Sequence, residues 1–279
     1  MLNAFTIDVE DYFQVAAFAK TIPVGDWDKW EFRVEGSTEK ILAILDEAGV
    51  KGTFFVLGWI AERAPQLVKR IAACGHTVAS HGTSHQFVHL QTEAEFREDV
   101  KTARKMLQDL SGQAVVSYRA PMFSITKKTP WAHRVLVEEG YLYDSSVFPI
   151  HHDLYGNPDA PTRIHRIETE SGSLLEFPPA IVKLLGQNIP VGGGGYFRLF
   201  PFAITRRMLQ SINAAGNPFM FYLHPWEVDP DQPKVPGAPL KSRFRHYLNL
   251  KRTASRLRRL LLAFPFAPME EILCQKQTS

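Results

Sequence analysis

The chain has 279 residues, of which 45% are hydrophobic and 22% charged, so one large α/β domain with a sizeable core fits it and a mainly disordered chain is excluded. Its two cysteines, Cys74 and Cys274, exclude a disulfide scaffold and a four-cysteine zinc site. The net charge of +3 is uneven, because residues 240–262 hold eight Lys/Arg and no acid, whereas the remainder holds 24 Lys/Arg against 29 Asp/Glu.

Short apolar runs alternate with helical stretches along the chain. We predict strands at residues 2–7, 53–57, 77–79, 115–118, 142–143 and 218–223. Between and after them we predict helices at 37–48, from 58 to 74, 92–110, 129–140, 204–215 and 243–264. Residues 146–200, rich in Pro and Gly, are predicted to be irregular. This alternation favours βαβ units and a parallel sheet.

Five polar residues come just after predicted strands: Asp8, His81, Arg119, Asp144 and His224. A (β/α) barrel brings such positions together at the carboxyl-end face, whereas an open sheet spreads them along a line. We therefore expect an irregular barrel with fewer than eight regular strands. It forms a single domain over residues 1–279, with a basic helix over about 243–264.

The residues themselves point to a metal site. Asp8 and Glu10 point to the same side of an extended strand, so one can hold a cation while the other takes a proton. His81 and His85, four apart, lie on one face of a helical turn and can share a metal, with His85 and His89 as a rival pair. Two histidines and one carboxylate are the ligand set of a catalytic zinc site that keeps a position open for water.

For the other candidate site residues, a structural explanation competes with the functional one. Pro121 gives a rigid way to aim Arg119 inward, although a structural salt bridge explains this arginine equally well. His224 ends an apolar strand, where a core histidine is also common. Tyr196 and Trp226 offer aromatic faces to a sugar or simply pack in the core. The four glycines at 192–195 lack a phosphate-loop signature and suit a loop that passes close to a ligand or neighbour.

Five motifs in sequence order, spanning Thr6 to Trp226, resemble the NodB-homology polysaccharide deacetylases, carbohydrate esterase family four. The stretches TIDVEDYFQV, SHGTSH, RAPMFS, YDSSVFP and FYLHPWEVDPDQPK are most similar to the subgroup of exopolysaccharide loci linked to the exosortase (PEP-CTERM) system. The resemblance implies a distorted (β/α)7 barrel, a divalent metal that is usually zinc, and hydrolysis of N-acetyl groups on amino-sugar polymers.

The resemblance also implies roles by position. It makes Asp8 the catalytic base, Arg119 the residue that orients this base, and His224 the general acid, tuned by Asp144. It places Glu10, His81 and His85 on the metal, and the backbone N–H of Met122 at the oxyanion. Two departures stand out: Val9 separates Asp8 from the next acid, which keeps Asp11 as an alternative ligand, and Met122 replaces an aromatic residue, so that Phe123 comes to line the groove.

The expected partner is an N-acetylated polysaccharide or a lipid-linked oligosaccharide, and no nucleic acid. Because the N-terminal stretch carries three acids and no base before Lys20, and no apolar run spans a membrane, we expect a cytoplasmic protein. The basic C-terminal helix offers peripheral contact with the inner membrane face. Two alternatives remain: an allantoinase-like cyclic amide or imide hydrolase of the same fold, and a non-catalytic glycan-binding protein.

Overall fold

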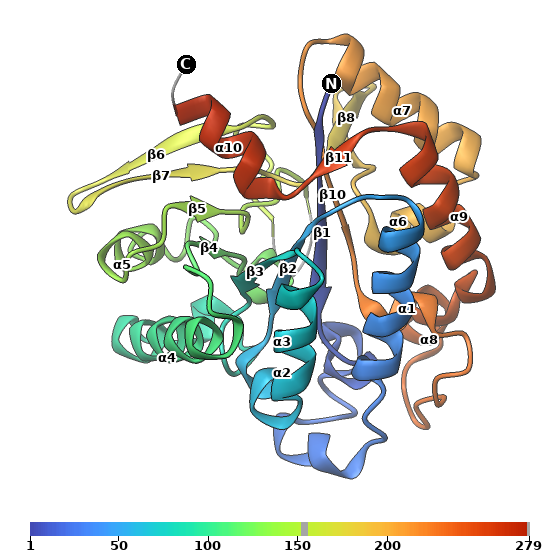
Figure 1. Cartoon of the computed structure of the whole chain (residues 1–279), viewed down its shortest axis with the longest axis horizontal. Coiled ribbons are helices and arrows are strands. Elements are labelled where there is room, and N and C mark those ends of the chain that lie inside the picture. The colour runs from blue at the N-terminus through green and yellow to red at the C-terminus, as the bar shows by residue number, and fades with distance from the viewer. Residues whose placement is uncertain (152–155, 278–279) are drawn as a thin grey trace.

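The structure is a computed structural model that describes residues 1–151 and 156–277 (Figure 1). Seven parallel strands run in the order β10-β1-β2-β3-β4-β5-β7, and β6 pairs antiparallel with β7 at one edge. Their bounds are β1 Asn3–Val9, β2 Thr53–Val56, β3 Thr77–Ser80, β4 Ser117–Tyr118, β5 Tyr143–Asp144, β6 His165–Thr169, β7 Gly172–Glu176 and β10 Met220–Leu223.

Irregular chain, not an eighth strand, joins the two ends of this sheet. After β7, the Ala180 N–H donates to the carbonyl of Met220 on β10 at 3.3 Å. Further along, the Tyr222 N–H donates to the Gly192 carbonyl at 2.7 Å. The sheet is therefore curved back toward its own first strand, which gives the irregular α/β barrel that the strand pattern predicts.

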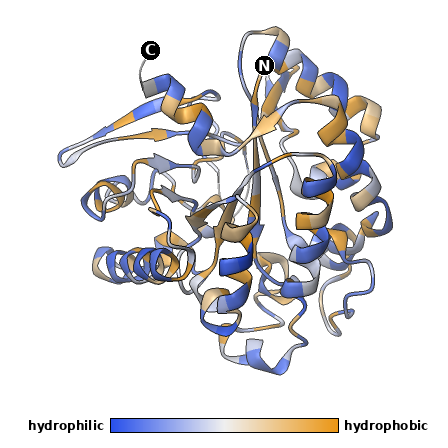
Figure 2. Ribbon diagram, in the orientation of Figure 1, coloured by the Kyte–Doolittle hydropathy of each residue, from blue (hydrophilic) through white to orange (hydrophobic). Residues whose placement is uncertain are grey.

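Helices cover the outside of the sheet, and their apolar residues follow helical spacing (Figure 2). In α4 (Glu93–Ser111), Phe96, Val100 and Leu107 are fully buried. Thr92 caps this helix by accepting from the Glu95 N–H, and Gly112 ends it in the left-handed conformation. The other long helices are α1 Val34–Glu47, α3 Pro65–Ala73, α7 Phe202–Ala214, α9 Leu250–Ala263 and α10 Met269–Gln277, and shorter ones are α2 Gly58–Arg63, α5 Ala132–Glu138, α6 Gly194–Leu199 and α8 Leu240–Tyr247.

Two predicted helices are each divided in two. The helix predicted to end at Cys74 breaks before Pro65, because proline cannot donate the hydrogen bond that a continuous helix needs. The helix predicted over 243–264 breaks at Asn249, whose φ of 55° is left-handed. The segment 146–200 is more regular than predicted: it holds β6, β7, the hairpin of β8 (Ile181–Leu184) with β9 (Gln187–Pro190), and α6, while residues 152–155 lie outside the described chain.

Much of the positive charge of α9 is used inside the fold. Arg256 donates to the carbonyls of Phe197 and Arg198, and the Arg259 guanidinium lies 4.2 Å from the Phe202 ring centroid. Arg258 pairs with Glu47 on α1. Membrane contact through this helix stays a prediction. These contacts leave fewer of its arginines free to bind an anionic membrane surface. None of the helices in the described chain is both long and apolar enough to cross a bilayer.

Candidate active site

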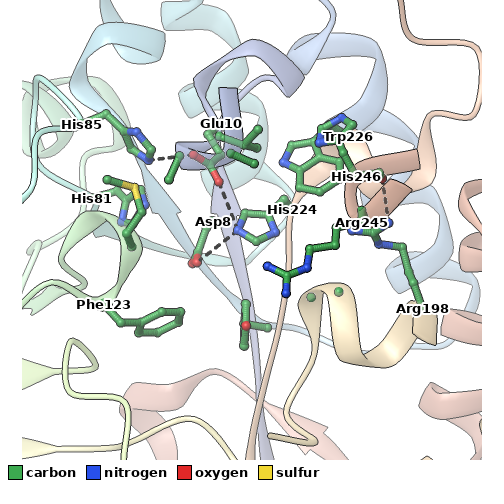
Figure 3. Close-up of a pocket in the computed structure, with 17 residues that line it drawn as sticks. Asp8, Glu10, His81, His85, Phe123, Arg198, His224, Trp226, Arg245 and His246 are labelled. Carbon is green, nitrogen blue, oxygen red and sulfur yellow. Dashed lines mark hydrogen bonds and ion pairs between the residues drawn. The ribbon is translucent and has the colours of Figure 1, made fainter. Parts of the chain in front are cut away.

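The carboxyl ends of the parallel strands deliver the predicted residues to one pocket (Figure 3). Asp8 lies near the end of β1, and Glu10 follows that strand directly. His81 follows β3 and His224 follows β10. The structure thus brings together side chains that are up to 216 positions apart in the sequence, as the barrel argument requires.

Glu10, His81 and His85 form a buried group in which one potential ligand atom from each lies within 4.8 Å of the others. The Nδ1 atom of His81 donates to the Arg119 carbonyl at 2.8 Å, which leaves Nε2 as the free ligand atom of a neutral ring. Burial is the main cause that lowers the pKa of His81 to about 3 and keeps the ring neutral. Burial tends to raise the pKa of Glu10, but His85 and His224 outweigh it and lower that pKa, so Glu10 is ionised.

This donor set fits a divalent transition metal. Glu10 Oε2 lies 2.7 Å from Nε2 of His85, yet this buried oxygen has no hydrogen-bond partner among the described residues. Two imidazole nitrogens and one carboxylate are ligands that zinc accepts with tetrahedral geometry. Asp11, the alternative ligand, is used elsewhere: its carboxylate accepts from the backbone N–H groups of Tyr12, Arg33 and Val34 and so caps the start of α1.

The turn that carries the two histidines is not helical, contrary to the prediction. Gly82 and His85 both have positive φ, 72° and 55°. Asp99 on α4 organises the turn, because its carboxylate accepts from the N–H groups of Thr83 and Ser84 at 3.0 Å each. A Cβ on Gly82 would lie 2.5 Å from Oδ2 of Asp99, so the turn requires glycine there.

Asp8 forms a buried ion pair with Arg119, and both side chains lie inside the barrel. The guanidinium of Arg119 also donates to the hydroxyl of Thr6 and to that of Ser145, each at 3.0 Å. Arg119 therefore holds one oxygen of Asp8 in a fixed place, while the other lies 3.8 Å from Nε2 of His224.

His224 has a partner that the sequence reasoning missed. Its Nδ1 atom donates to Glu227 at 2.8 Å, and the other oxygen of Glu227 accepts from buried Arg198 at 2.6 Å. Burial would lower the pKa of His224, but Glu10, Glu227 and Asp8 together raise it to about 9, so the ring is cationic at neutral pH. The sequence feature that could have identified this partner is the acid three residues after His224, because one turn of the chain brings its carboxylate to the imidazole ring.

The assignment of Asp144 as the partner of His224 is corrected by these contacts. Asp144 instead lies 3.1 Å from Nε2 of His133 and accepts from the Ser146 hydroxyl at 2.5 Å. That hydroxyl accepts in turn from the Ala120 N–H at 2.8 Å. Glu176 completes this second group, and burial beside Asp144 raises its pKa well above the usual range. Asp144 thus supports the loop after Arg119 and does not reach His224.

Strained backbone gathers at the pocket. Met122 and Phe123, which line it, have φ of 54° and 51°, and His85 is also left-handed. Non-glycine residues rarely adopt this conformation unless the surrounding structure holds it. Gly193, with a φ of 137°, must be glycine, because a Cβ there would lie 1.8 Å from the carbonyl oxygen of Tyr222.

Of the aromatic candidates, Phe123 and Trp226 line the pocket and Tyr196 does not. Tyr196, which is half-buried, lies beside Phe200, with ring centroids 6.1 Å apart. Trp226 is stacked between His224 and His246, with centroids 5.3 and 4.2 Å away. His246 is therefore part of the pocket wall as well.

Comparison with known proteins assigns the two parts of the chain separately. Residues 26–139 match the family described as Polysaccharide deacetylase. This match takes in less than half of the chain, and it relates residues 26–139 to the polysaccharide deacetylases. Residues 145–274 match a family described as Domain of unknown function (DUF3473), and this second segment supplies His224, Glu227 and Arg198.

Curated deacetylases are similar to this chain over part of their length. The peptidoglycan-N-acetylglucosamine deacetylase of Bacillus cereus is 38% identical over 96 residues, 34% of this chain and 35% of its own. The chitooligosaccharide deacetylase of Bradyrhizobium sp. (strain ANU 289) is 26% identical over 155 residues, 56% of this chain and 66% of its own. The chain thus spans between about a third and two thirds of these two proteins.

Solved structures confirm the predicted fold class. A Mycobacterium smegmatis protein assigned to the polysaccharide deacetylases superposes with a TM-score of 0.61 at 23% identity, covering 97% of this chain and 88% of its own. Puue allantoinase superposes with a TM-score of 0.60 at 15% identity, covering 97% of this chain and 88% of its own. At these identities the likeness establishes the α/β fold alone.

Proposed function

We propose that this protein is a metal-dependent hydrolase that removes N-acetyl groups from amino sugars. The observation that carries the proposal is a group of three side chains that can hold a metal, Glu10, His81 and His85, beside an acid-base couple formed by Asp8 and His224. Arg119 fixes Asp8 on one side and Glu227 fixes His224 on the other. The deacetylases among the relatives support the choice of an N-acetylated sugar as substrate.

In this mechanism Asp8, held in place by its ion pair with Arg119, takes a proton from the attacking water. Glu10, His81 and His85 would hold a divalent metal, which would supply Lewis-acid polarisation of the acetyl carbonyl and a lowered pKa for bound water. The backbone N–H of Met122 donates to the developing oxyanion. His224, cationic beside Glu227, then gives its Nε2 proton to the departing amine nitrogen. The products are acetate and the free amino sugar.

We further propose that the substrate is a bacterial exopolysaccharide or its lipid-linked precursor, in keeping with the motif resemblance to exosortase-linked loci. A cytoplasmic location at the inner membrane face is part of this proposal. The alternative of a cyclic amide hydrolase is tested with the same preparation by offering a ring amide such as allantoin. Release of acetate from chitotetraose together with no turnover of allantoin supports the deacetylase.

The decisive test combines metal analysis with activity. We expect His81→Ala to lose the metal and the acetate release, whereas His224→Ala retains the metal and loses about 100-fold or more of kcat, as the removal of a general acid does. The exposed His89, four residues beyond His85, is the control, and His89→Ala should change neither quantity. Metal loss in His224→Ala would make that residue a ligand instead. A fully metal-loaded parent protein that releases no acetate would refute the proposed function.

A further inference from the structure

One wall of the pocket has a charge that deacetylation of a neutral sugar does not use. This wall comes from the segment that matches the family of unknown function, and it includes Gly194, Gly195, Arg198, Arg245 and His246. Figure 3 shows the Arg245 guanidinium reaching into the pocket below His224, on the side away from His85.

The two arginines of this wall differ in their partners. Arg198 is buried, and its Nε donates to Glu227 while its Nη1 donates to the carbonyls of Arg245, His246 and Leu248. Arg245 is exposed, and its guanidinium has neither a hydrogen bond nor an ion pair within residues 1–151 and 156–277. Its backbone is nevertheless fixed, because its carbonyl accepts from Arg198 at 3.0 Å. The backbone of Arg245 is thus held in place, while its unpaired guanidinium extends into the pocket.

No carboxylate within the described part of the chain pairs with this cation. Residues 240–262 contain no acid, and the two carboxylates of the pocket are already engaged, Asp8 by Arg119 and Glu10 by the histidines. The same pocket wall is open at Gly195, where a Cβ would have no neighbour closer than Nη2 of Arg198 at 4.0 Å. In addition, the buried Nε1 of Trp226, another lining residue, has no hydrogen-bond partner among the described residues.

We propose that Arg245 binds an anionic group, a carboxylate or a phosphate, carried on or beside the N-acetylated sugar. A guanidinium recognises both groups with paired hydrogen bonds. The inference rests on the proposed function and narrows it to an acidic substrate. Two sources offer this chemistry: a uronate next to the amino sugar in a polymer, and the diphosphate of a lipid-linked precursor.

The test compares three substrates: chitotetraose, a tetrasaccharide that alternates N-acetylglucosamine with glucuronate, and N-acetylglucosamine joined to a prenyl diphosphate. We expect the parent protein to prefer one of the two anionic substrates, which identifies the source of the anion. Arg245→Gln should lower the ratio of kcat/KM for that substrate to kcat/KM for chitotetraose about tenfold, mainly through KM, and Arg245→Lys should restore part of it. Arg243→Gln, on the same helix but outside the pocket lining, is the matched control.

The inference is overturned if the parent shows no preference for either anion, or if Arg245→Gln reduces all three substrates equally. Calorimetric binding of both anionic substrates is measured in parallel, so that the inference is decided even where no acetate is released. There we expect Arg245→Gln to raise the Kd about tenfold, and an unchanged Kd counts against the inference. Absence of acetate release with Arg245-dependent binding would refute only the proposed deacetylation.

Discussion

At His224, carboxylates act on both nitrogens of one ring. Glu227 accepts from Nδ1, while Nε2 lies 3.1 Å from Glu10 and 3.8 Å from Asp8. Burial would raise the pKa of Glu227, but Arg198 and His224 lower it to about 2, so this carboxylate stays ionised at every working pH. The proton on Nε2 is the one that the proposed mechanism delivers, and Glu227 favours the ring that carries it.

Replacing Glu227 therefore changes the pH dependence of the reaction. Without this carboxylate the pKa of His224 falls from about 9, so we expect Glu227→Gln to move the alkaline limb of kcat to lower pH. The buried guanidinium of Arg198 also loses its partner, which should cost ~3–5 kcal/mol in the free energy of unfolding. NMR titration of the His224 ring checks the pKa directly, with the exposed Glu168→Gln as control. An alkaline limb that stays in place would show that Glu227 has only a structural role.

Single residues were predictable where a strand fixes their direction. The period of two along β1 places Asp8 and Glu10 on one side, and the structure joins Glu10 to the histidines while Asp11 caps α1. Glu227 was missed because it acts across a turn after a strand, where no periodic pattern applies. Asp144 was misassigned because the sequence places it at the end of a barrel strand, β5, but does not show where its side chain points. In the structure this side chain turns toward His133 on α5.

Among the elements, strands and their ends were more predictable than the turns between them. Apolar β-branched runs such as residues 53–56 are buried throughout and need no further information. The turn from His81 to His85 is different, because its shape is set by Asp99 on α4, fourteen positions beyond His85. Four-residue spacing alone indicates a helical turn, and only the tertiary contact selects the left-handed alternative.

This dependence makes Asp99 a residue that acts on the metal ligands from a distance. Asp99→Ala leaves the N–H groups of Thr83 and Ser84 without their acceptor and loosens the turn that presents His85. We expect zinc affinity, measured by competition with a chelator, to fall about 10- to 100-fold, as when supporting partners of metal ligands are removed. Asp109→Ala, at an exposed position of the same helix, should have no effect. Equal zinc affinity in parent and Asp99→Ala would show that the turn holds its shape without this carboxylate.

Over the whole molecule, the two segments matched by different families share one sheet. β2, β3 and β4 lie in the first segment, and β7 and β10 lie in the second. Closure of this ring was foreseeable only in outline, since it depends on irregular contacts of Ala180 and Gly192 with β10. Sequence periodicity carries no information about such pairings, and this is why the segment 146–200 resisted prediction.

Whether the two family-matched segments fold as one unit can be tested at the end of the barrel that lies opposite the pocket. There Glu270 on α10, which Figure 1 shows beside the N-terminal end of the sheet, accepts from the hydroxyls of Thr53 on β2 and Ser117 on β4. Glu270→Ala leaves both buried hydroxyls without this acceptor, so we expect the free energy of unfolding to fall by ~2–4 kcal/mol.

If the chain is a single domain, this loss affects all of it at once. Chemical denaturation followed by far-ultraviolet circular dichroism and by tryptophan fluorescence should then give one coincident transition, shifted to lower denaturant in Glu270→Ala. Glu271→Ala, an exposed neighbour, should unfold like the parent. Two separate transitions, of which Glu270→Ala shifts only one, would show that the segments are independent folding units and would contradict the single-domain prediction.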